Sequence, residues 1–180
     1  QTGYPLVTVT TKRSSENVEL RFQQERFLYD HLLGNPGKEA ASWKIPLNVA
    51  VEGESKPTSK LMESTEDNLG IDLPGQGAGD HPVWIKVNSE QTGFFRVNYP
   101  LEEWGILRDA IKMEQVPAID RLGLQNDAYA LVRSGKAPAS LFLDLASAYR
   151  EESDASVLGD LSANLGGLEA LISEQPYADK

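Results

Sequence analysis

The hydrophobic period of this chain changes near residue 100, and that change limits the possible folds more than any other feature. Before this point, short segments alternate apolar with polar residues and are rich in Val, Ile, Thr and aromatic side chains, a pattern typical of strands. After it, apolar residues recur every three or four positions, as in amphipathic helices. The sequence therefore predicts a β domain over residues 1–99 and the start of a helical domain over residues 100–180.

About seven strands are expected in the first part. The segments with the clearest strand pattern are residues 6–11, 18–23, 43–51, 83–88 and 93–99, and a weaker pattern covers 59–64 and 69–73. Short strands separated by turn residues favour a small antiparallel β-sandwich of the immunoglobulin-like kind.

Two local features of this part can be predicted in more detail. Residues 83–99, VWIKVNSEQTGFFRVNY, are predicted to form a hairpin in which Gly93 supplies the left-handed turn residue. Alternation along its first strand puts two sets of side chains on opposite faces: Val83, Ile85 and Val87 against Trp84, Lys86 and Asn88. Within residues 18–27 the parity of the apolar positions shifts, which predicts a bulge near Gln23 and Gln24.

Four helices are expected after Tyr99. They cover residues 101–113, the stretch between Pro117 and Gly135, a segment from Pro138, and a segment around residues 158–172. Their apolar stripes are, in order, Leu101, Trp104, Leu107 and Ile111; Ile119, Leu122, Ala128, Leu131 and Val132; Leu141, Phe142, Leu145 and Tyr149; Leu158, Leu161, Leu165, Leu168 and Ile172. Short links predict antiparallel packing, as in bundles and HEAT-like repeats. We expect the last helix to expose an apolar flank, because no further repeat follows to cover it.

Composition narrows the function classes. The net charge is −10, and residues 100–180 alone carry 7 basic and 14 acidic groups, so nucleic acid is an unfavourable partner. The apolar runs are too short for a membrane span. The chain has no cysteine and no Asn-x-Ser/Thr sequon, which fits a cytoplasmic protein. It opens on Gln1 without a secretory signal, which suggests a piece of a longer chain.

No pattern in the sequence indicates a catalytic centre. The only two histidines, His31 and His81, are fifty positions apart, whereas a zinc site needs convergent His and carboxylate ligands. The Gly-rich stretch 74–82 lacks the Lys-Ser/Thr of a phosphate-binding loop and is expected to be an exposed turn. The neighbouring carboxylates at 102–103 and 151–152 do not face each other on a helix, and we expect both pairs to be solvated.

The densest polar cluster lies in AIDRLGLQNDAYALVRSG, residues 118–135. In a helix, Asp120 falls in the first turn, where a carboxylate meets free N–H groups and the positive end of the helix dipole. Arg121 points about 100° away and could pair with a carboxylate or carbonyl of the preceding sandwich. Further along are Gln125, Asn126 and Asp127, and some of them can cap or bond neighbouring helices. Because no nucleophile has a base beside it, we interpret the cluster as a structural joint.

Five blocks of the sequence together resemble the gluzincin zinc aminopeptidases, particularly their puromycin-sensitive branch. The blocks are QTGYPLVTV (1–9), WKIPL (43–47), FFRVNY followed by EEW (94–104), DRLGLQNDAYALVRSG (120–135) and DLSANLGGL (160–168). The resemblance covers essentially the whole chain. It departs from the family mainly in the loop 74–82 and the Gly166–Gly167 pair, which affect loop length and helix regularity.

The resemblance implies a third, β-sandwich domain followed by the first helices of a C-terminal helical domain. It also implies a parent enzyme that removes N-terminal residues from peptides with a zinc-bound water. The family's His-Glu-x-x-His and Gly-x-Met-Glu-Asn motifs are absent here, so the resemblance assigns no catalytic, cofactor-binding or metal residue to this chain. It implies contact with the parent's catalytic and remaining helical domains, and a spacer or hinge role in which Asp120 and Arg121 fix the entry of a helix.

A second hypothesis is an autonomous β-sandwich module that binds a peptide or a glycan. Trp43, Trp84 and Trp104 could form its aromatic platform, although single tryptophans on strands and helices more often pack in a core.

Overall fold

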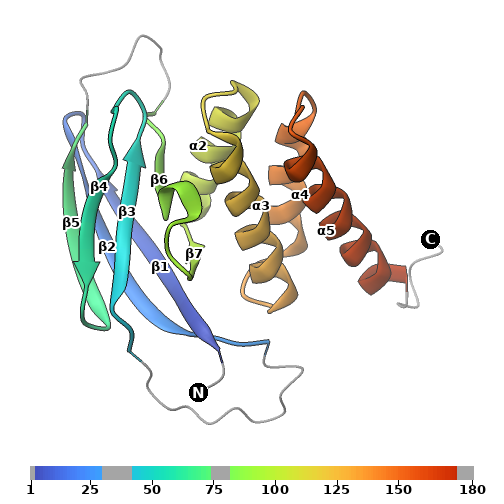
Figure 1. Ribbon diagram of the computed structural model, residues 1–180, viewed down its shortest axis with the longest axis horizontal. Coiled ribbons are helices and arrows are strands. Elements are labelled where there is room, and N and C mark those ends of the chain that lie inside the picture. The colour runs from blue at the N-terminus through green and yellow to red at the C-terminus, as the bar shows by residue number, and fades with distance from the viewer. Residues whose placement is uncertain (1–2, 30–41, 74–81, 174–180) are drawn as a thin grey trace.

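The computed structural model describes residues 3–29, 42–73 and 82–173, in which two packed β-sheets are followed by a row of helices (Figure 1). The strands are β1 Tyr4–Arg13, β2 Asn17–Phe27, β3 Ile45–Val51, β4 Thr58–Met62, β5 Glu66–Asp72, β6 Ile85–Val87 and β7 Arg96–Asn98. One sheet has the order β5-β2-β1-β7 and the other β4-β3-β6. The predicted sandwich and each of its strands are therefore confirmed.

The predicted bulge in β2 is wrong. Strands β1 and β2 pair without interruption from Tyr4 opposite Phe27 to Arg13 opposite Val18. The alternation of buried and exposed residues continues to Gln24, which is 5% exposed. Its side-chain amide donates to the carbonyls of Trp43 and Ser64 and accepts from the N–H of Trp43. A buried glutamine thus occupies a core position because its hydrogen bonds are satisfied.

The predicted hairpin over residues 83–99 is also wrong. Strands β6 and β7 lie in different sheets, and β7 runs parallel to β1. The left-handed residues between them are Asn88, Glu90 and Gln91, not Gly93. Glycine is needed at position 93 for another reason: a Cβ there would lie 2.3 Å from the Cε1 atom of Phe95.

Both faces of the β6 segment are buried, which the alternating pattern did not reveal. One face meets the sandwich core and the other meets the helices, so Trp84, Lys86 and Asn88 are covered as completely as Ile85 and Val87.

The four predicted helices are present: α2 Leu101–Lys112, α3 Ala118–Arg133, α4 Ala139–Ala146 and α5 Ala155–Ser173. A proline directly precedes each of the first three, with φ between −57° and −71° that suits a helix start. Gly135, with φ +73°, follows the end of α3 as predicted. Asp154, the residue before α5, caps the helix: its Oδ1 accepts from the N–H groups of Ser156 and Val157. The Gly166–Gly167 pair does not interrupt it.

The predicted apolar stripes are only partly correct. Leu101 and Ile119 are 72% and 44% exposed, because each lies in the first turn on the outer side of its helix. On α4 and the 3₁₀ turn after it, all four predicted stripe residues are buried. On α5, Leu161 and Leu168 are buried and Leu158, Leu165 and Leu171 are exposed, so the expected apolar flank is present.

The change from strands to helices falls at Pro100, and buried side chains on both sides of it form one connected core. The division into domains 1–99 and 100–180 stays a prediction. Helices α2 and α3 cover the β6–β7 end of the sandwich, and α4 and α5 pack on α3 away from it (Figure 1). No helix among the described residues is long and apolar enough to cross a membrane.

Candidate functional site at the junction of sandwich and helices

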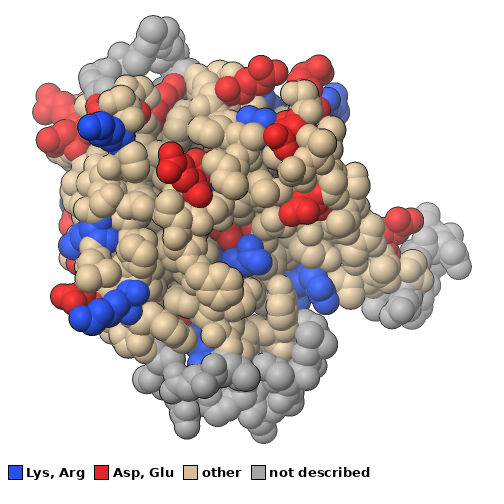
Figure 2. All heavy atoms as spheres, viewed as in Figure 1, with Lys and Arg blue, Asp and Glu red and all other residues tan. Residues whose placement is uncertain are grey.

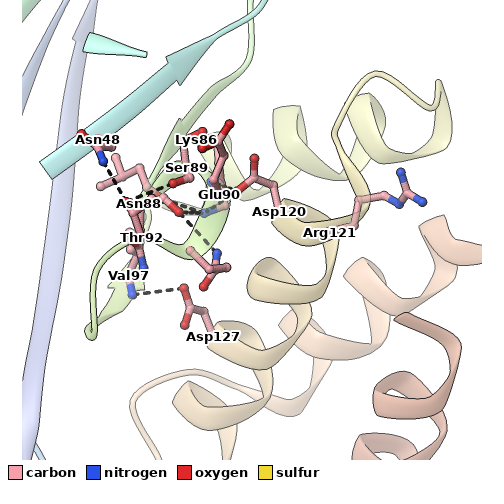
Figure 3. Close-up of polar contacts among 12 residues, drawn as sticks. Asn48, Lys86, Asn88, Ser89, Glu90, Thr92, Val97, Asp120, Arg121 and Asp127 are labelled. Carbon is pink, nitrogen blue, oxygen red and sulfur yellow. Dashed lines mark hydrogen bonds and ion pairs between the residues drawn. The ribbon is translucent and has the colours of Figure 1, made fainter. Parts of the chain in front are cut away.

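Helix α3 carries two carboxylates toward the sandwich. Asp120 and Asp127 are two helical turns apart and therefore share a face, and they are 2% and 1% exposed. Figure 3 shows both pointing at the segment between β6 and β7, whereas Arg121 points away. Buried carboxylates need hydrogen-bond donors, and each of these finds a backbone N–H of the sandwich.

Asp120 binds the turn that links the two sheets. Its Oδ1 accepts from the backbone N–H of Glu90 at 2.8 Å and lies 3.7 Å from the Nζ of Lys86. The second distance is too long for a direct hydrogen bond, so Lys86 acts on Asp120 as a nearby charge. Asp120 lies in the first turn of α3, as predicted, but no side-chain hydrogen bond caps the helix.

Asp127 covers the edge of β7. Its Oδ2 accepts from the N–H of Val97 at 3.2 Å, and its Oδ1 pairs with the guanidinium of Arg96 at 3.2 Å. Because β7 is the edge strand of its sheet and pairs only with β1, the N–H of Val97 lacks a strand partner. The carboxylate takes the place of a neighbouring strand and protects this edge.

The edge of β6 is closed in a similar way. The hydroxyl of Tyr99 accepts from the N–H of Val87 at 2.9 Å and donates to its carbonyl at 3.2 Å. Lys86, fully buried, donates its Nζ to the carbonyls of Val87 at 2.6 Å and Asn88 at 3.1 Å. Strand edges, one lysine and two carboxylates thus form a single buried polar network.

Burial shifts the protonation equilibria of this network. It raises the pKa of Asp127 to about 6, against the opposing charges of Arg96 and Lys86. Burial also raises the pKa of Asp120, which Lys86 opposes, and lowers the pKa of Lys86, which the two aspartates oppose. The charges are therefore held at an electrostatic cost that each partner partly offsets.

The turn that α3 meets has an unusual backbone. Asn88, Glu90 and Gln91 have φ of 59°, 59° and 54°, in the left-handed region that non-glycine residues rarely adopt. The side chain of Gln91 lies against Gly123 of α3, where a Cβ would be 1.8 Å from its Nε2. The spacing Asp120, Gly123, Asp127 thus gives one face of α3 two acceptors with a gap between them.

The opposite face of α3 binds the later helices. Arg121 makes a two-pronged pair with Glu152 at 2.6 and 2.7 Å and donates to the carbonyl of Val116 at 2.7 Å. The predicted partner of Arg121, a group of the sandwich, is therefore wrong, because the side chain leaves α3 on the far side. Hydrogen bonds from Arg121 lower the pKa of Glu152.

Two amides of the cluster bond α5, as predicted. Gln125 donates to the carbonyl of Val157 at 2.8 Å. Asn126 donates to Asp160 at 3.0 Å and accepts from Asn164 at 3.0 Å. Beside them, Gly167 leaves room for the hydroxyl of Tyr129, which would lie 2.1 Å from a Cβ at that position.

In each of the neighbouring carboxylate pairs, 102–103 and 151–152, one side chain is exposed and the other is buried. Glu103 is 1% exposed and pairs with Arg13 of β1 at 2.6 Å through both oxygens, and Glu152 pairs with Arg121. The prediction of solvated pairs is therefore wrong for Glu103 and Glu152 and correct for Glu102 and Glu151.

Sequence reasoning missed the sandwich partners of α3: Lys86, Glu90, Arg96 and Val97. Alternation along residues 83–88 predicts two opposite faces, but it does not show that a helix packs on one of them. One signal was present: Lys86 stands among Val83, Trp84, Ile85 and Val87, a run with apolar residues of both parities, which is typical of a strand covered on both sides.

Metal ligation finds no support in the part of the chain that the structure describes. No group of three or more His, Cys, Asp or Glu side chains there could hold a metal ion, so these residues do not fit the zinc that the resemblance implies for a parent enzyme. His31, His81 and residues 74–81 of the Gly-rich stretch lie outside the described residues.

A family model for the ERAP1-like C-terminal domain matches residues 84–180, which include β6, the turn, β7 and all four helices. The chain belongs to this family. Puromycin-sensitive aminopeptidase of Caenorhabditis elegans is 28% identical over 97% of the chain, and aminopeptidase M1-C of Oryza sativa subsp. japonica is 32% identical over 91%. The thyrotropin-releasing hormone-degrading ectoenzyme of Rattus norvegicus is 31% identical over 86%.

The resemblance to the aminopeptidases is thereby confirmed: the chain is an M1 aminopeptidase segment. It spans 18%, 18% and 15% of the length of these three relatives. Every residue of the polar network just described, from Lys86 to Asp127, lies inside the matched family domain.

Proposed function

We propose that this chain is a non-catalytic segment of a zinc aminopeptidase that removes N-terminal residues from peptides. In this role the sandwich is a spacer, and α3 joins it to the helical domain at a hinge. The two-faced arrangement of α3 carries the proposal: Asp120 and Asp127 bind the sandwich, while Arg121 and Gln125 bind the elements that follow.

Asp120 and Arg121 have complementary parts in this proposal. Asp120 fixes the start of α3 against the turn after β6. Arg121 fixes the same start against Glu152 in the link before α5, and the hydroxyl of Tyr149 donates to the carbonyl of Arg121 at 2.7 Å. One helical turn thus sets the position of the sandwich on one side and of the later helices on the other.

Peptide hydrolysis in the parent would be assigned to other parts of the polypeptide. Zinc would supply the attacking water there, and this chain would contact the catalytic domain and the remaining helices. The net charge of −10 disfavours binding to nucleic acid. On the face shown in Figure 2, acidic side chains in red and basic side chains in blue are dispersed. We therefore propose no nucleic-acid partner. A cytoplasmic location is proposed on the absence of cysteines and sequons from the sequence.

The test uses the 180-residue chain and the full-length parent side by side. Each is incubated with zinc and an aminoacyl-anilide, with and without a chelator. We expect chelator-sensitive release of the aniline from the parent and none from the 180-residue chain. Chelator-sensitive turnover by the short chain, or none by the parent, would contradict the proposal.

The alternative, an autonomous peptide- or glycan-binding sandwich, has less support. Its platform requires exposed tryptophans, but Trp84 and Trp104 are 8% and 3% exposed, and the Trp104 ring packs edge-on against Tyr99. Binding of the isolated chain to a peptide or glycan array would favour this alternative.

A further inference from the structure

The two ends of the turn between β6 and β7 are bonded to each other, and one of them is bonded to the sandwich. At its start, the side chain of Asn88 accepts from the N–H of Gly93 at 2.8 Å and donates to its carbonyl at 3.0 Å. At its end, Asn48 of β3 donates to the hydroxyl of Thr92 at 2.7 Å. These bonds fix residues 88, 92 and 93 without any contribution from the helices (Figure 3).

The centre of the turn is held by α3. The N–H of Glu90 donates to Asp120, and the side chain of Gln91 occupies the gap over Gly123. Of the three left-handed residues, asparagine tolerates this conformation best, whereas Glu90 and Gln91 adopt it only under constraint. The side chain of Glu90 is exposed, so it makes no buried contact that would explain its backbone.

We propose that the turn Asn88–Gln91 is a two-state mechanical element whose centre α3 holds in the left-handed conformation. When α3 moves away from the sandwich, Glu90 and Gln91 relax to right-handed or extended backbone while the anchored ends stay in place. The junction therefore opens in one discrete step rather than bending continuously, because the left-handed region is separated from the other allowed regions of backbone conformation. Its use as the hinge of the parent rests on the proposed function; the strain is a property of this chain.

The exposed side chain of Glu90 permits a matched pair of variants. Glu90→Gly and Glu90→Ala both remove the carboxylate, but only glycine adopts φ near 59° at low cost. In the 180-residue chain, chemical denaturation should give a folding equilibrium constant about 3- to 10-fold larger for Glu90→Gly than for Glu90→Ala. The ratio measures the strain at this residue.

The same pair in an Asp120→Ala background tests whether α3 imposes that strain. With the acceptor of the Glu90 N–H removed, the turn relaxes and the ratio should fall to 1 or below, because alanine is favoured over glycine once φ is no longer left-handed. A ratio of 1 or less in the otherwise unchanged chain would contradict the strain. An unchanged ratio in the Asp120→Ala background would show that the turn holds itself, and would overturn the proposal.

Should the Asp120→Ala chain fail to fold, Gly123→Ala provides the second background, because its methyl group displaces the Gln91 side chain without removing a charge. The same collapse of the ratio is expected there, and an unchanged ratio would again overturn the proposal. Neither readout involves hydrolysis, so a failure of the aminopeptidase proposal would leave this ratio unaffected, and the reverse also holds.

Discussion

On the face of α3 that meets the sandwich, two carboxylates are almost fully buried. Asp120 accepts from the N–H of Glu90 in the turn, and Asp127 accepts from the N–H of Val97 at an open sheet edge. On the face that meets the later helices, the contacts are two neutral amides and one ion pair whose arginine keeps 17% of its side chain exposed. On the first face, burial raises the pKa of Asp127 and so disfavours its charged form. On the second face, hydrogen bonds from Arg121 lower the pKa of Glu152 and so favour its charged form. One helix thus binds its two neighbours by different means. Toward the sandwich it uses buried charges, whose desolvation opposes binding but whose hydrogen bonds are specific. Toward the later helices it uses neutral amides and one partly exposed ion pair, for which the desolvation penalty is smaller.

The largest effect should come from removing the cation that the sandwich-facing carboxylates share. Lys86→Met keeps the length of this fully buried side chain but leaves Asp120 and Asp127 with less compensation. We expect a loss of about 3–5 kcal/mol in unfolding free energy, measured by urea denaturation. Lys112→Met, at a lysine whose side chain is 48% exposed, is the control and should change stability by less than about 0.5 kcal/mol. A loss below about 1 kcal/mol for Lys86→Met would contradict the claim that the sandwich-facing carboxylates depend on a buried cation.

The change in unfolding free energy with pH should have opposite signs for the carboxylates on the two faces. Burial raises the folded-state pKa of Asp127 to about 6, above its ordinary value of 3.8, so the folded state binds its proton more tightly than the unfolded state. The contribution of this group to stability is therefore fully present below pH 3.8 and is lost as pH rises through 6. Compared with Asp127→Asn, the unmodified chain should gain on the order of 1–3 kcal/mol in unfolding free energy between pH 7 and pH 4.

Glu152, on the other face, should behave in the opposite way. Its folded-state pKa is lowered, chiefly by hydrogen bonds from Arg121, so its contribution is present above the ordinary value and is lost as pH falls through the folded pKa. A Glu152→Gln chain should therefore lose less stability on acidification than the unmodified chain. Parallel pH profiles for the Asp127 and Glu152 variants would refute the proposed contrast.

Arg121→Ala should have an intermediate effect. It removes two charge-assisted bonds to Glu152 and one to Val116, and we expect a loss of about 2 kcal/mol by thermal or urea unfolding. Glu152 keeps its bonds from the N–H groups of Ser153 and Asp154, which limits the loss. In the full-length parent, unchanged thermal stability and unchanged domain closure would remove Arg121 from the proposed joint.

The smallest effect is expected for Asn126→Ala. Its two side-chain hydrogen bonds to α5 involve neutral or exposed groups, so their loss should cost about 0.5–1 kcal/mol. A cost as large as that of Lys86→Met would mean that α5, not the sandwich, is the demanding partner of α3.

The sequence predicts the elements well and their partners poorly. Strands and helices follow from local periodicity, and Pro117, Gly135 and Pro138 mark helix boundaries that the structure keeps. The hairpin over 83–99 is wrong because alternation cannot tell a strand that returns to its own sheet from one that crosses to the other.

Burial by a distant element leaves little local signal. Glu103 has the sequence context of a solvated residue, and it is buried where α2 meets β1. Lys86 lies in a run with apolar residues of both parities, but that run does not show that α3 is the element that meets it. In the polar cluster at 120–127, the predicted contacts of Gln125 and Asn126 with a neighbouring helix are confirmed, and the interpretation of the cluster as a joint stays a prediction. Which side chains face the sandwich and which face the later helices depends on the packing of elements that are distant in the sequence.

The claim that α3 completes the hydrogen bonding of the sandwich is tested most directly by amide hydrogen exchange at Val97. In the 180-residue chain this N–H should be protected, because the Asp127 carboxylate accepts from it at 3.2 Å. In an Asp127→Ala chain, we expect Val97 to exchange at least about 10-fold faster relative to Val49, a strand residue of the other sheet that reports global unfolding. An unchanged ratio of the two exchange rates would contradict the account.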